Sequence, residues 1–412
     1  MNNGKYYYGY IRKNIYLDNA ASCLAFNKVK QSVDEFLLNY GSVHRGSGYN
    51  SEISTLAYEL SRKNILNIIG GTENDCVIFT NNTTDSINKF CLINQDKSKK
   101  VLISDIEHSS NLLPWKKYFQ VVQFETINFK IDSNIIESYL KNDEFEFVAV
   151  SAASNITGYY TNLEEIYTVC KKYGVKLFVD ASQYAPHRIP SLKYADVIAY
   201  CGHKMGAPFG IGVLAGSKEL LNKESSITGG GNIIYMDKNG NPIYKETPYM
   251  QEAGTPNSVA AIAINEAHNI LYNTIGEKEL QMHTEKLNIC IRDSIDKLKE
   301  YGYNVYFAEE INDRSPILVI SNTVKSNKET VKLLNSSYKE YDKHIFCREG
   351  AFCAYNILEK MHSQLKFINP VINGKLNPKY SLIRLSAGFI NSEEDIYYTV
   401  DKLIDINKNN RR

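Results

Sequence analysis

Between residues 101 and 215, short apolar segments alternate with segments that have the apolar spacing of helices. The apolar segments cover residues 101–105, 145–150, 175–180 and 195–200. Parallel strands need a crossover connection, which is usually a helix, so this alternation predicts a mostly parallel sheet covered by helices on both faces. In an open α/β sheet of this kind, ligands bind at the carboxyl ends of the strands. We therefore expect the functional residues to follow the apolar segments directly.

Two of these expected strand ends carry groups that suit one cofactor. One segment ends in Asp180, and the next leads into Gly202-His203-Lys204. A lysine can form a Schiff base with pyridoxal phosphate, and an aspartate can keep the pyridinium nitrogen protonated so that the ring draws in electrons. Taken alone, each residue is equally consistent with a surface lysine after a strand and with a helix-capping aspartate. Together they predict a pyridoxal phosphate site.

A possible phosphate site follows another short strand, at residues 76–80. This segment leads into a cluster of hydroxyls and amides that includes Thr83 and Thr84, just before an amphipathic helix. The free N–H groups and the dipole of a helix N-terminus favour an anion such as phosphate. Simple helix capping is the alternative interpretation.

Three further polar residues follow predicted strands. His108 could stack on a flat heteroaromatic ring and relay protons near neutral pH. Asn155 is placed to hydrogen-bond a ring substituent, or only to make a turn, and Gln183 adds a polar group at the Asp180 edge. A purely structural role stays open for each of them.

Composition excludes several other classes of function. The chain has 412 residues, and its 47 Lys and Arg nearly balance its 46 Asp and Glu, which argues against nucleic-acid or membrane-surface binding driven by bulk charge. No apolar run approaches the roughly 18 residues of a membrane span, and the N-terminus has no secretory signal pattern. The eight cysteines are dispersed, without zinc-site spacing, so we expect free thiols, no metal site and a cytoplasmic location.

The composition of the chain changes near residue 273. Thr255 before Pro256 predicts the start of a long helix, after which the sequence becomes more charged. A charged helix over 277–301 is then followed by strand-like segments, at 305–307, 317–320, 345–347 and 381–386. We therefore predict a large domain over 26–272 and a smaller α+β domain over 1–25 and 273–412.

Three motifs, taken in order, resemble those of a known family. They are Gly202-His203-Lys204, Glu252-Ala253-Gly254-Thr255-Pro256-Asn257 and Arg348-Glu349-Gly350-Ala351-Phe352-Cys353-Ala354. The chain resembles the class V aminotransferase group of fold-type I pyridoxal phosphate enzymes, and most of all the group II cysteine desulfurases and selenocysteine lyases. The resemblance implies an α/β fold-type I transferase with a large mostly parallel mixed-sheet domain, a smaller α+β C-terminal domain and a homodimeric assembly.

The resemblance also implies how the cofactor is held. Lys204 would attach it covalently, Asp180 would pair with the pyridine nitrogen, and Gln183 would bind the phenolic oxygen. His108 would stack on the ring, with Asn155 at the edge of the ring's substituents. The phosphate would be held by Thr83, Thr84 and His203, and by Thr255 from the other subunit.

For the substrate, the resemblance implies an amino acid whose carboxylate is clamped by Arg384, with Asn155 nearby. Cys353 would take the sulfur as a persulfide, and Arg348 is the cation available to lower the pKa of its thiol. Cys353 follows Arg348 and Gly350 in a loop where a thiol can be exposed, whereas free cysteines, Cys347 among them, are usually small buried hydrophobes.

The chain departs from the family pattern at three places. Ala351-Phe352 stands where desulfurases often have a histidine pair, Cys201 where relatives have serine, and Gly48 where many have histidine. The Phe-Cys pair also looks like the sulfurase domain of molybdenum-cofactor sulfurases. These departures leave open both the substrate and the sulfur acceptor.

The sequence therefore predicts an enzyme that abstracts sulfur from L-cysteine or a related amino acid through a Cys353 persulfide and passes it to an acceptor protein. A C–S lyase, aminotransferase or epimerase of the same class, in which Cys353 is incidental, stays open. A non-catalytic scaffold is the other alternative, and it gives no chemical reason for keeping Lys204, Asp180, His108 and Arg384 together.

Overall fold

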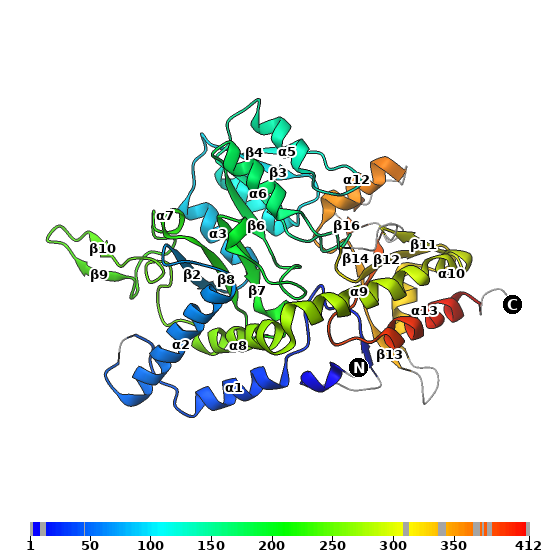
Figure 1. Cartoon of the computed structure of the whole chain (residues 1–412), viewed down its shortest axis with the longest axis horizontal. Helices are drawn as coiled ribbons and strands as arrows, with labels where there is room; N and C mark the ends of the chain where they lie inside the picture. The colour runs from blue at the N-terminus through cyan, green and yellow to red at the C-terminus, as the bar shows by residue number, and fades with distance from the viewer. Residues whose placement is uncertain are drawn as a thin grey trace.

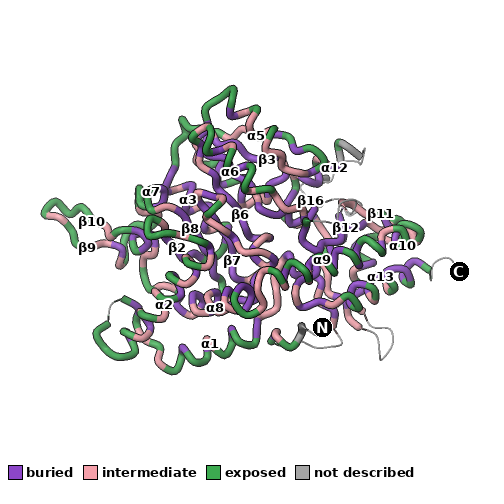
Figure 2. The backbone as a smooth tube through the Cα atoms, in the orientation of Figure 1, coloured by how far each residue is buried: buried purple, intermediate pink, exposed green. Residues whose placement is uncertain are grey.

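A computed structural model of the chain describes residues 3–8, 14–44, 46–307, 313–336, 343–365, 371–372, 375–376 and 381–408. A large sheet with helices on both sides occupies the centre of the molecule, and a smaller sheet lies to one side of it (Figure 1). Both sheets have a buried interior, which Figure 2 shows as purple stretches along the central strands.

The large sheet has seven strands in the order β2-β8-β7-β6-β5-β3-β4. Their bounds are Asp75–Thr80 (β2), Gly212–Ser217 (β8), Val197–Cys201 (β7), Lys176–Asp180 (β6), Phe147–Ser151 (β5), Lys100–Ser104 (β3) and Gln120–Phe124 (β4). All neighbours from β7 to β4 are parallel, and β8 runs antiparallel to both β7 and β2. The predicted mostly parallel mixed sheet is confirmed.

The strands of this sheet are apolar throughout because both faces are covered. Along β3, Val101 and Ile103 pack into the core on one face and Leu102 into the core on the other. Three helices cover the first face: α3 (Thr83–Ile93), α4 (Leu113–Tyr118) and α7 (Lys218–Leu221). On the second face lie α1 (Asn27–Leu37), α2 (Tyr49–Ile68), α5 (Ser133–Leu140), α6 (Leu163–Lys172) and α8 (Ser258–His268).

The smaller sheet is antiparallel, with the order β11-β12-β17-β14. Its strands are Tyr303–Tyr306 (β11), Ile317–Asn322 (β12), Leu382–Ser386 (β17) and Arg348–Gly350 (β14). On one face lie α9 (Glu277–Asp293), α10 (Ile295–Glu300), α11 (Asn327–Asn335) and α13 (Glu393–Lys408). On the other face lies α12 (Tyr355–Leu365). This arrangement confirms the expected α+β character of the C-terminal part.

The N-terminal segment joins the two cores. β1 (Asn14–Tyr16) pairs in parallel with β13 (His344–Phe346), and Ile15 packs into the core of the smaller sheet. Tyr7 instead packs into the core of the large sheet. The domain boundaries at residues 25/26 and 272/273 stay predictions.

Two predicted helix limits are wrong. The helix expected to begin at Thr255-Pro256 begins at Ser258, because the side chain of Asn257 caps it by accepting a hydrogen bond from the Ala260 amide at 3.2 Å. The helix expected over 277–301 is divided at Ser294, whose hydroxyl donates to the Cys290 carbonyl at 2.7 Å. A π-helical stretch, Asn269–Gly276, connects α8 to α9. The remaining strands form two hairpins, β9 (Ile233–Met236) with β10 (Pro242–Tyr244) and β15 (Val371–Ile372) with β16 (Lys375–Leu376).

Candidate active site

A cavity of about 890 Å³ lies at the carboxyl ends of β5, β6 and β7, and it reaches the smaller sheet. All the site residues predicted from the sequence except Thr255 line it: Thr83, Thr84, His108, Asn155, Asp180, Gln183, His203, Lys204, Arg348, Cys353 and Arg384. The structure thus brings together residues that are up to 301 positions apart in the sequence. The cavity is the candidate active site.

Lys204 and Asp180 are placed by neighbouring strands. Asp180 is the last residue of β6, and its Oδ1 accepts hydrogen bonds from the amide (2.9 Å) and the hydroxyl (2.6 Å) of Ser182. Lys204 ends a short 3-10 helix that directly follows β7. Gly202 begins this turn, and a Cβ there would lie 2.6 Å from the side chain of Ile211. The glycine before His203-Lys204 is therefore needed for the close return of the chain.

Hydroxyl groups gather at the N-terminus of α3. Asn82 caps this helix by accepting from the Asp85 amide at 3.0 Å. Thr83 Oγ1 lies 2.8 Å from the hydroxyl of Ser182, and Thr84 Oγ1 lies 2.7 Å from the hydroxyl of Ser110. A helix N-terminus surrounded by hydroxyls suits a phosphate group.

His108 is held as a neutral side chain at the cavity wall. Its Nδ1 accepts from the Ser110 amide at 3.2 Å. Burial lowers the pKa of His108 below its ordinary value; the charge of Asp180 opposes this shift, and those of Lys204 and Arg384 add to it. The imidazole is therefore uncharged at pH 7 and can take part in stacking or proton transfer.

Glu107, the residue before His108, supports the part of the cavity wall that carries His108, and it was not predicted from the sequence. Its carboxylate is buried, and burial raises its pKa. It accepts hydrogen bonds from Ser104 Oγ (2.6 Å), Asn111 Nδ2 (2.8 Å) and the Ser151 amide (3.0 Å). These contacts join the ends of β3 and β5, so Glu107 fixes the position from which His108 projects.

Arg384 and Arg348 lie opposite each other on β17 and β14 and share one carboxylate. Arg348 donates from Nε and Nη2 to Asp18 Oδ2 at 3.1 and 2.8 Å. Arg384 Nη2 lies 3.5 Å from Asp18 Oδ1, and its Nη1 donates to the Asn155 carbonyl at 2.9 Å. Burial lowers the pKa of Arg384 to about 10, and the charge of Asp18 opposes this shift. Among the described residues, none accepts a hydrogen bond from Arg384 Nε.

Asp18 was not predicted as a site residue. The signal that could have found it is its position, because it directly follows the apolar segment that ends at Leu17. The partners of Asp18 lie more than 300 positions away, so the sequence alone could not assign it to them.

Cys353 occupies a tight turn between β14 and α12. All eight cysteines lie in the described part of the chain and are free, and only Cys353 is exposed, which confirms the expected exposure. Its φ is 57°, and that of Phe352 is 53°. The Cys353 carbonyl accepts from the Ser109 amide at 3.0 Å, and the Phe352 carbonyl accepts from Asn155 Nδ2 at 2.9 Å. Ser109 and Asn155 thus hold the left-handed turn through hydrogen bonds to the backbone of both of its residues.

Two other cysteines named in the sequence analysis, Cys347 and Cys201, differ from Cys353. Cys347 is only partly exposed, and burial raises the pKa of its thiol to about 12. Cys201 is buried beside Thr83 and lines the cavity. Burial raises the pKa of Cys201, but a hydrogen bond with His203 and the charge of Lys204 outweigh burial, so that its pKa lies below the ordinary value.

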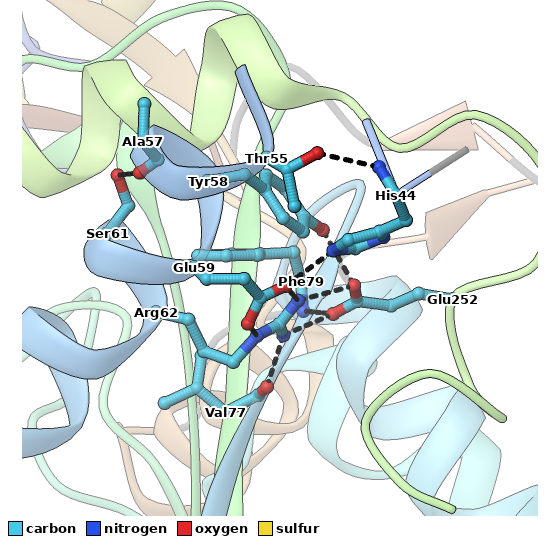
Figure 3. A network of polar contacts seen from close by, with 10 residues as sticks. All are labelled: His44, Thr55, Ala57, Tyr58, Glu59, Ser61, Arg62, Val77, Phe79 and Glu252. Carbon is cyan, nitrogen blue, oxygen red and sulfur yellow. Dashed lines mark hydrogen bonds and ion pairs between the residues drawn. The ribbon is translucent and has the colours of Figure 1, made fainter. Parts of the chain in front are cut away.

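Thr255 is exposed and does not line the cavity of its own chain. Its segment is nevertheless fixed by Glu252, which accepts four hydrogen bonds (Figure 3). The donors are Tyr58 Oη (2.6 Å), Arg62 Nη1 and Nη2 (2.7 and 2.8 Å) and the Phe79 amide (2.7 Å). The segment carrying Thr255 is therefore anchored to α2 and β2.

The same network continues to the surface. Arg62 Nε donates to Glu59 Oε2 at 3.1 Å, and Glu59 Oε1 lies 2.7 Å from His44 Nε2. Figure 3 shows these side chains converging between α2 and the loop that carries His44. His44 is thus tied to α2 through Glu59, and its amide also donates to Thr55 Oγ1 at 2.8 Å.

The residues around the cavity fit pyridoxal phosphate by their chemistry. A carboxylate at a strand end suits the pyridinium nitrogen, a lysine amine suits the aldehyde, and the α3 N-terminus suits the phosphate.

Within the described ranges, no group of three or more His, Cys, Asp or Glu side chains is arranged to hold a metal ion. No helix in the described part of the chain combines the length and apolarity needed to cross a bilayer.

Comparison with known proteins identifies the family of the chain. Residues 15–398 match the family described as Aminotransferase class-V. A probable cysteine desulfurase from Pyrococcus abyssi is 32% identical over 363 residues, covering 84% of this chain and 86% of the relative. One from Aeropyrum pernix is 30% identical over 359 residues, covering 83% and 85%. The apo structure of a cysteine desulfurase from Thermococcus onnurineus superposes with a TM-score of 0.84 at 27% identity, covering 96% of this chain and 95% of that one. The chain therefore belongs to the class V aminotransferase family and is similar to cysteine desulfurases.

Proposed function

We propose that this protein is a pyridoxal phosphate-dependent cysteine desulfurase that removes sulfur from L-cysteine. The observation that carries the proposal is that Lys204 and Cys353, the one exposed thiol among the eight cysteines, line the same cavity. The names of the relatives from Pyrococcus abyssi and Aeropyrum pernix support the same activity.

Pyridoxal phosphate would be held by Asp180 and Gln183 at the ring, by Thr83, Thr84 and His203 at the phosphate, and by Lys204 through a covalent bond. When bound, the cofactor supplies an electron-withdrawing ring that stabilises negative charge at the substrate carbon. Lys204 Nζ would move protons to and from the substrate carbons, and neutral His108, which lines the same cavity, would relay them.

The substrate carboxylate would be bound by Arg384. Arg384 Nε is a buried donor for which no described residue provides an acceptor, and Nη2 has only the long contact of 3.5 Å with Asp18. A carboxylate has two oxygens that can accept from both nitrogens in a bidentate pair. This interaction would select an amino acid and orient its side chain toward Cys353.

Cys353 Sγ would then form a bond with the substrate sulfur as the carbon–sulfur bond breaks. The electron pair of that bond stays with the carbon, which takes up a proton and leaves as alanine, and the sulfur remains on Cys353 as a persulfide. Arg348, whose guanidinium is held by Asp18, adds an exposed positive charge to the wall of the same cavity. The exposed position of Cys353 suits delivery of the sulfur to an acceptor protein.

The proposed assembly is a homodimer in which Thr255 reaches the phosphate site of the partner subunit. Large apolar side chains are exposed on α1 and α2 beside this region: Leu37, Tyr49, Leu56 and Leu60. Thr255→Ala should leave the dimer intact and weaken pyridoxal phosphate binding, measured by cofactor titration alongside light scattering. A monomer that binds the cofactor as tightly as the dimer would contradict this assembly. The eight free cysteines support a reducing, cytoplasmic location.

The decisive experiment is to incubate the purified protein with L-cysteine and identify the product. Alanine supports desulfuration, whereas pyruvate or a keto acid would assign a C–S lyase or an aminotransferase. Cys353→Ser should keep bound cofactor and lose alanine formation by several orders of magnitude, and Cys347→Ser should be much milder. Alanine release by Cys353→Ser at the wild-type rate would exclude Cys353 as the sulfur acceptor.

A further inference from the structure

Phe352 closes a triangle of contacts with Arg384 and Asn155. The Cζ atom of Arg384 lies 4.6 Å from the centroid of the Phe352 ring. The Phe352 carbonyl accepts from Asn155 Nδ2 at 2.9 Å, and the Asn155 carbonyl accepts from Arg384 Nη1 at 2.9 Å. The residue next to the candidate nucleophile is therefore in direct contact with the arginine that would bind the substrate carboxylate.

Arg384 has little other compensation for its charge. It is 2% exposed, and its carboxylate neighbour Asp18 lies at 3.5 Å and is also bound by Arg348. The face of an aromatic ring carries negative electrostatic potential and attracts a guanidinium, more strongly where water is excluded. The guanidinium carbon lies over the face of the Phe352 ring, and this contact restricts the rotation of the guanidinium. Nε, for which no described residue provides an acceptor, and the weakly paired Nη2 are left for a ligand.

Packing alone does not explain why position 352 is a phenylalanine. Phe352 packs only partly buried against the hydrophobic cluster that lies between the two sheets. Its φ of 53° is strained for any residue with a side chain, so the backbone gives no preference for phenylalanine over leucine. What distinguishes phenylalanine from leucine here is the ring face that it presents to Arg384.

We propose that Phe352 is a positioning residue for carboxylate recognition at this site. Its ring fixes the guanidinium plane of Arg384 relative to the adjacent Cys353, so that a molecule with a carboxylate is preferred and its reacting atom is brought to the Cys353 thiol. The proposal rests on the proposed function for the identity of the substrate, but its physical content is the coupling between Phe352, Arg384 and Cys353.

The coupling can be measured by alkylating Cys353 in the holoenzyme with iodoacetate and, separately, with iodoacetamide. In both reactions the Cys353 sulfur displaces iodide, and the two reagents differ in the carboxylate that Arg384 can bind. The rate at Cys353 is read by mass spectrometry of its peptide. Phe352→Leu should lower the ratio of the iodoacetate rate to the iodoacetamide rate about tenfold, in the range expected for a buried cation–π contact. Phe352→Tyr, which keeps the ring, should stay within about twofold of the wild type.

The chain offers a matched control. Phe129 belongs to the same hydrophobic cluster and has a similar left-handed φ of 60°, and it contacts Phe307 rather than Arg384. Phe129→Leu should leave the ratio unchanged, and Phe352→Met replaces Phe352→Leu if the latter does not fold. An unchanged ratio in Phe352→Leu, or an equal fall in Phe352→Leu and Phe352→Tyr, would overturn the proposal and assign Phe352 to packing. Because alkylation needs no sulfur transfer, a protein that forms no alanine but shows the predicted ratios would contradict the proposed function and leave this inference standing.

Discussion

Replacing Glu252 by glutamine tests whether the buried network anchors the segment that carries Thr255. The side chains of Glu252 and Arg62 are 6% and 8% exposed, so their ion pair is almost fully removed from water. Glu252 Oε1 accepts from Arg62 and from the Phe79 amide, and Oε2 accepts from Arg62 and from Tyr58. A glutamine keeps the shape of the side chain, loses the charge and turns one acceptor into a donor.

The expected loss follows from the groups that are left behind. One of the two oxygens disappears, so at least one Arg62 nitrogen faces another donor, and the Arg62 charge loses its buried counter-ion. Breaking a buried ion pair by removing one partner costs about 3–5 kcal/mol. With an unfolding entropy of about 2.1 cal/mol/K per residue, a chain of 412 residues shifts by about 1.2 °C per kcal/mol, so the unfolding midpoint should fall by roughly 3–6 °C.

The assay is thermal unfolding of the holoenzyme at pH 7.5, followed by near-ultraviolet circular dichroism, together with titration of the apoprotein with pyridoxal phosphate. Glu252→Gln should lower both the Tm and the cofactor affinity, since Thr255 follows the anchor by three residues. Glu59→Gln is the matched control, because Glu59 contacts the same arginine from a partly exposed position, with 29% of its side chain accessible. Its cost should be at most about 1 kcal/mol. A Tm loss in Glu252→Gln no larger than in Glu59→Gln would refute the reasoning.

Two further predictions concern charge. Asp18→Asn leaves buried Arg384 without its carboxylate neighbour and should destabilise the protein by about 1–3 kcal/mol. Added L-alanine should restore part of the lost Tm, because its carboxylate can replace that of Asp18. Equal Tm shifts on adding L-alanine to the variant and to the wild type would contradict this prediction. Burial lowers the pKa values of His187 and His268 to about 4, from an ordinary value of about 6.5, so between these pH values the unfolded chain binds protons that the folded chain does not. Stability should therefore fall as the pH drops from about 6.5 to about 4, by about 1.4 kcal/mol per pH unit for each histidine, and a Tm that is flat over this range would argue against buried neutral imidazoles.

The sequence could predict those site residues that follow a strand locally. Lys204, Asp180 and His108 each come after an apolar segment, and a parallel sheet necessarily brings such ends to one edge. Asp18 and Phe352 could not be assigned in this way, because their roles depend on Arg384, which reaches them through the pairing of β17 in the other sheet.

The helices and strands that the sequence did not predict correctly also have physical explanations. β4 reads Gln-Val-Val-Gln-Phe and is an edge strand in which only Phe124 is buried, so it lacks the apolar pattern of the central strands. The start of α8 was placed too early because proline is common in the first turn of helices, whereas here the cap is Asn257, one residue after Pro256. The break at Ser294 falls within a charged stretch that has no glycine or proline to mark it.

The links between the chain's two ends have a consequence for the order in which a ribosome can complete this enzyme. Asn19 Nδ2 donates to the Ser386 carbonyl at 3.0 Å and to Asn391 Oδ1 at 3.1 Å, and the Ala20 amide donates to Ser386 Oγ at 3.0 Å. The last strand of the large sheet, β8, leaves the ribosome about 170 residues before the end of β17, which at typical rates of synthesis is roughly 10–30 s earlier. The nascent chain can thus assemble Asp180 and Lys204 well before Asp18 and Asn19 find their partners. Arg384, the residue that would bind the substrate carboxylate in the proposed function, therefore joins the site after Asp180 and Lys204.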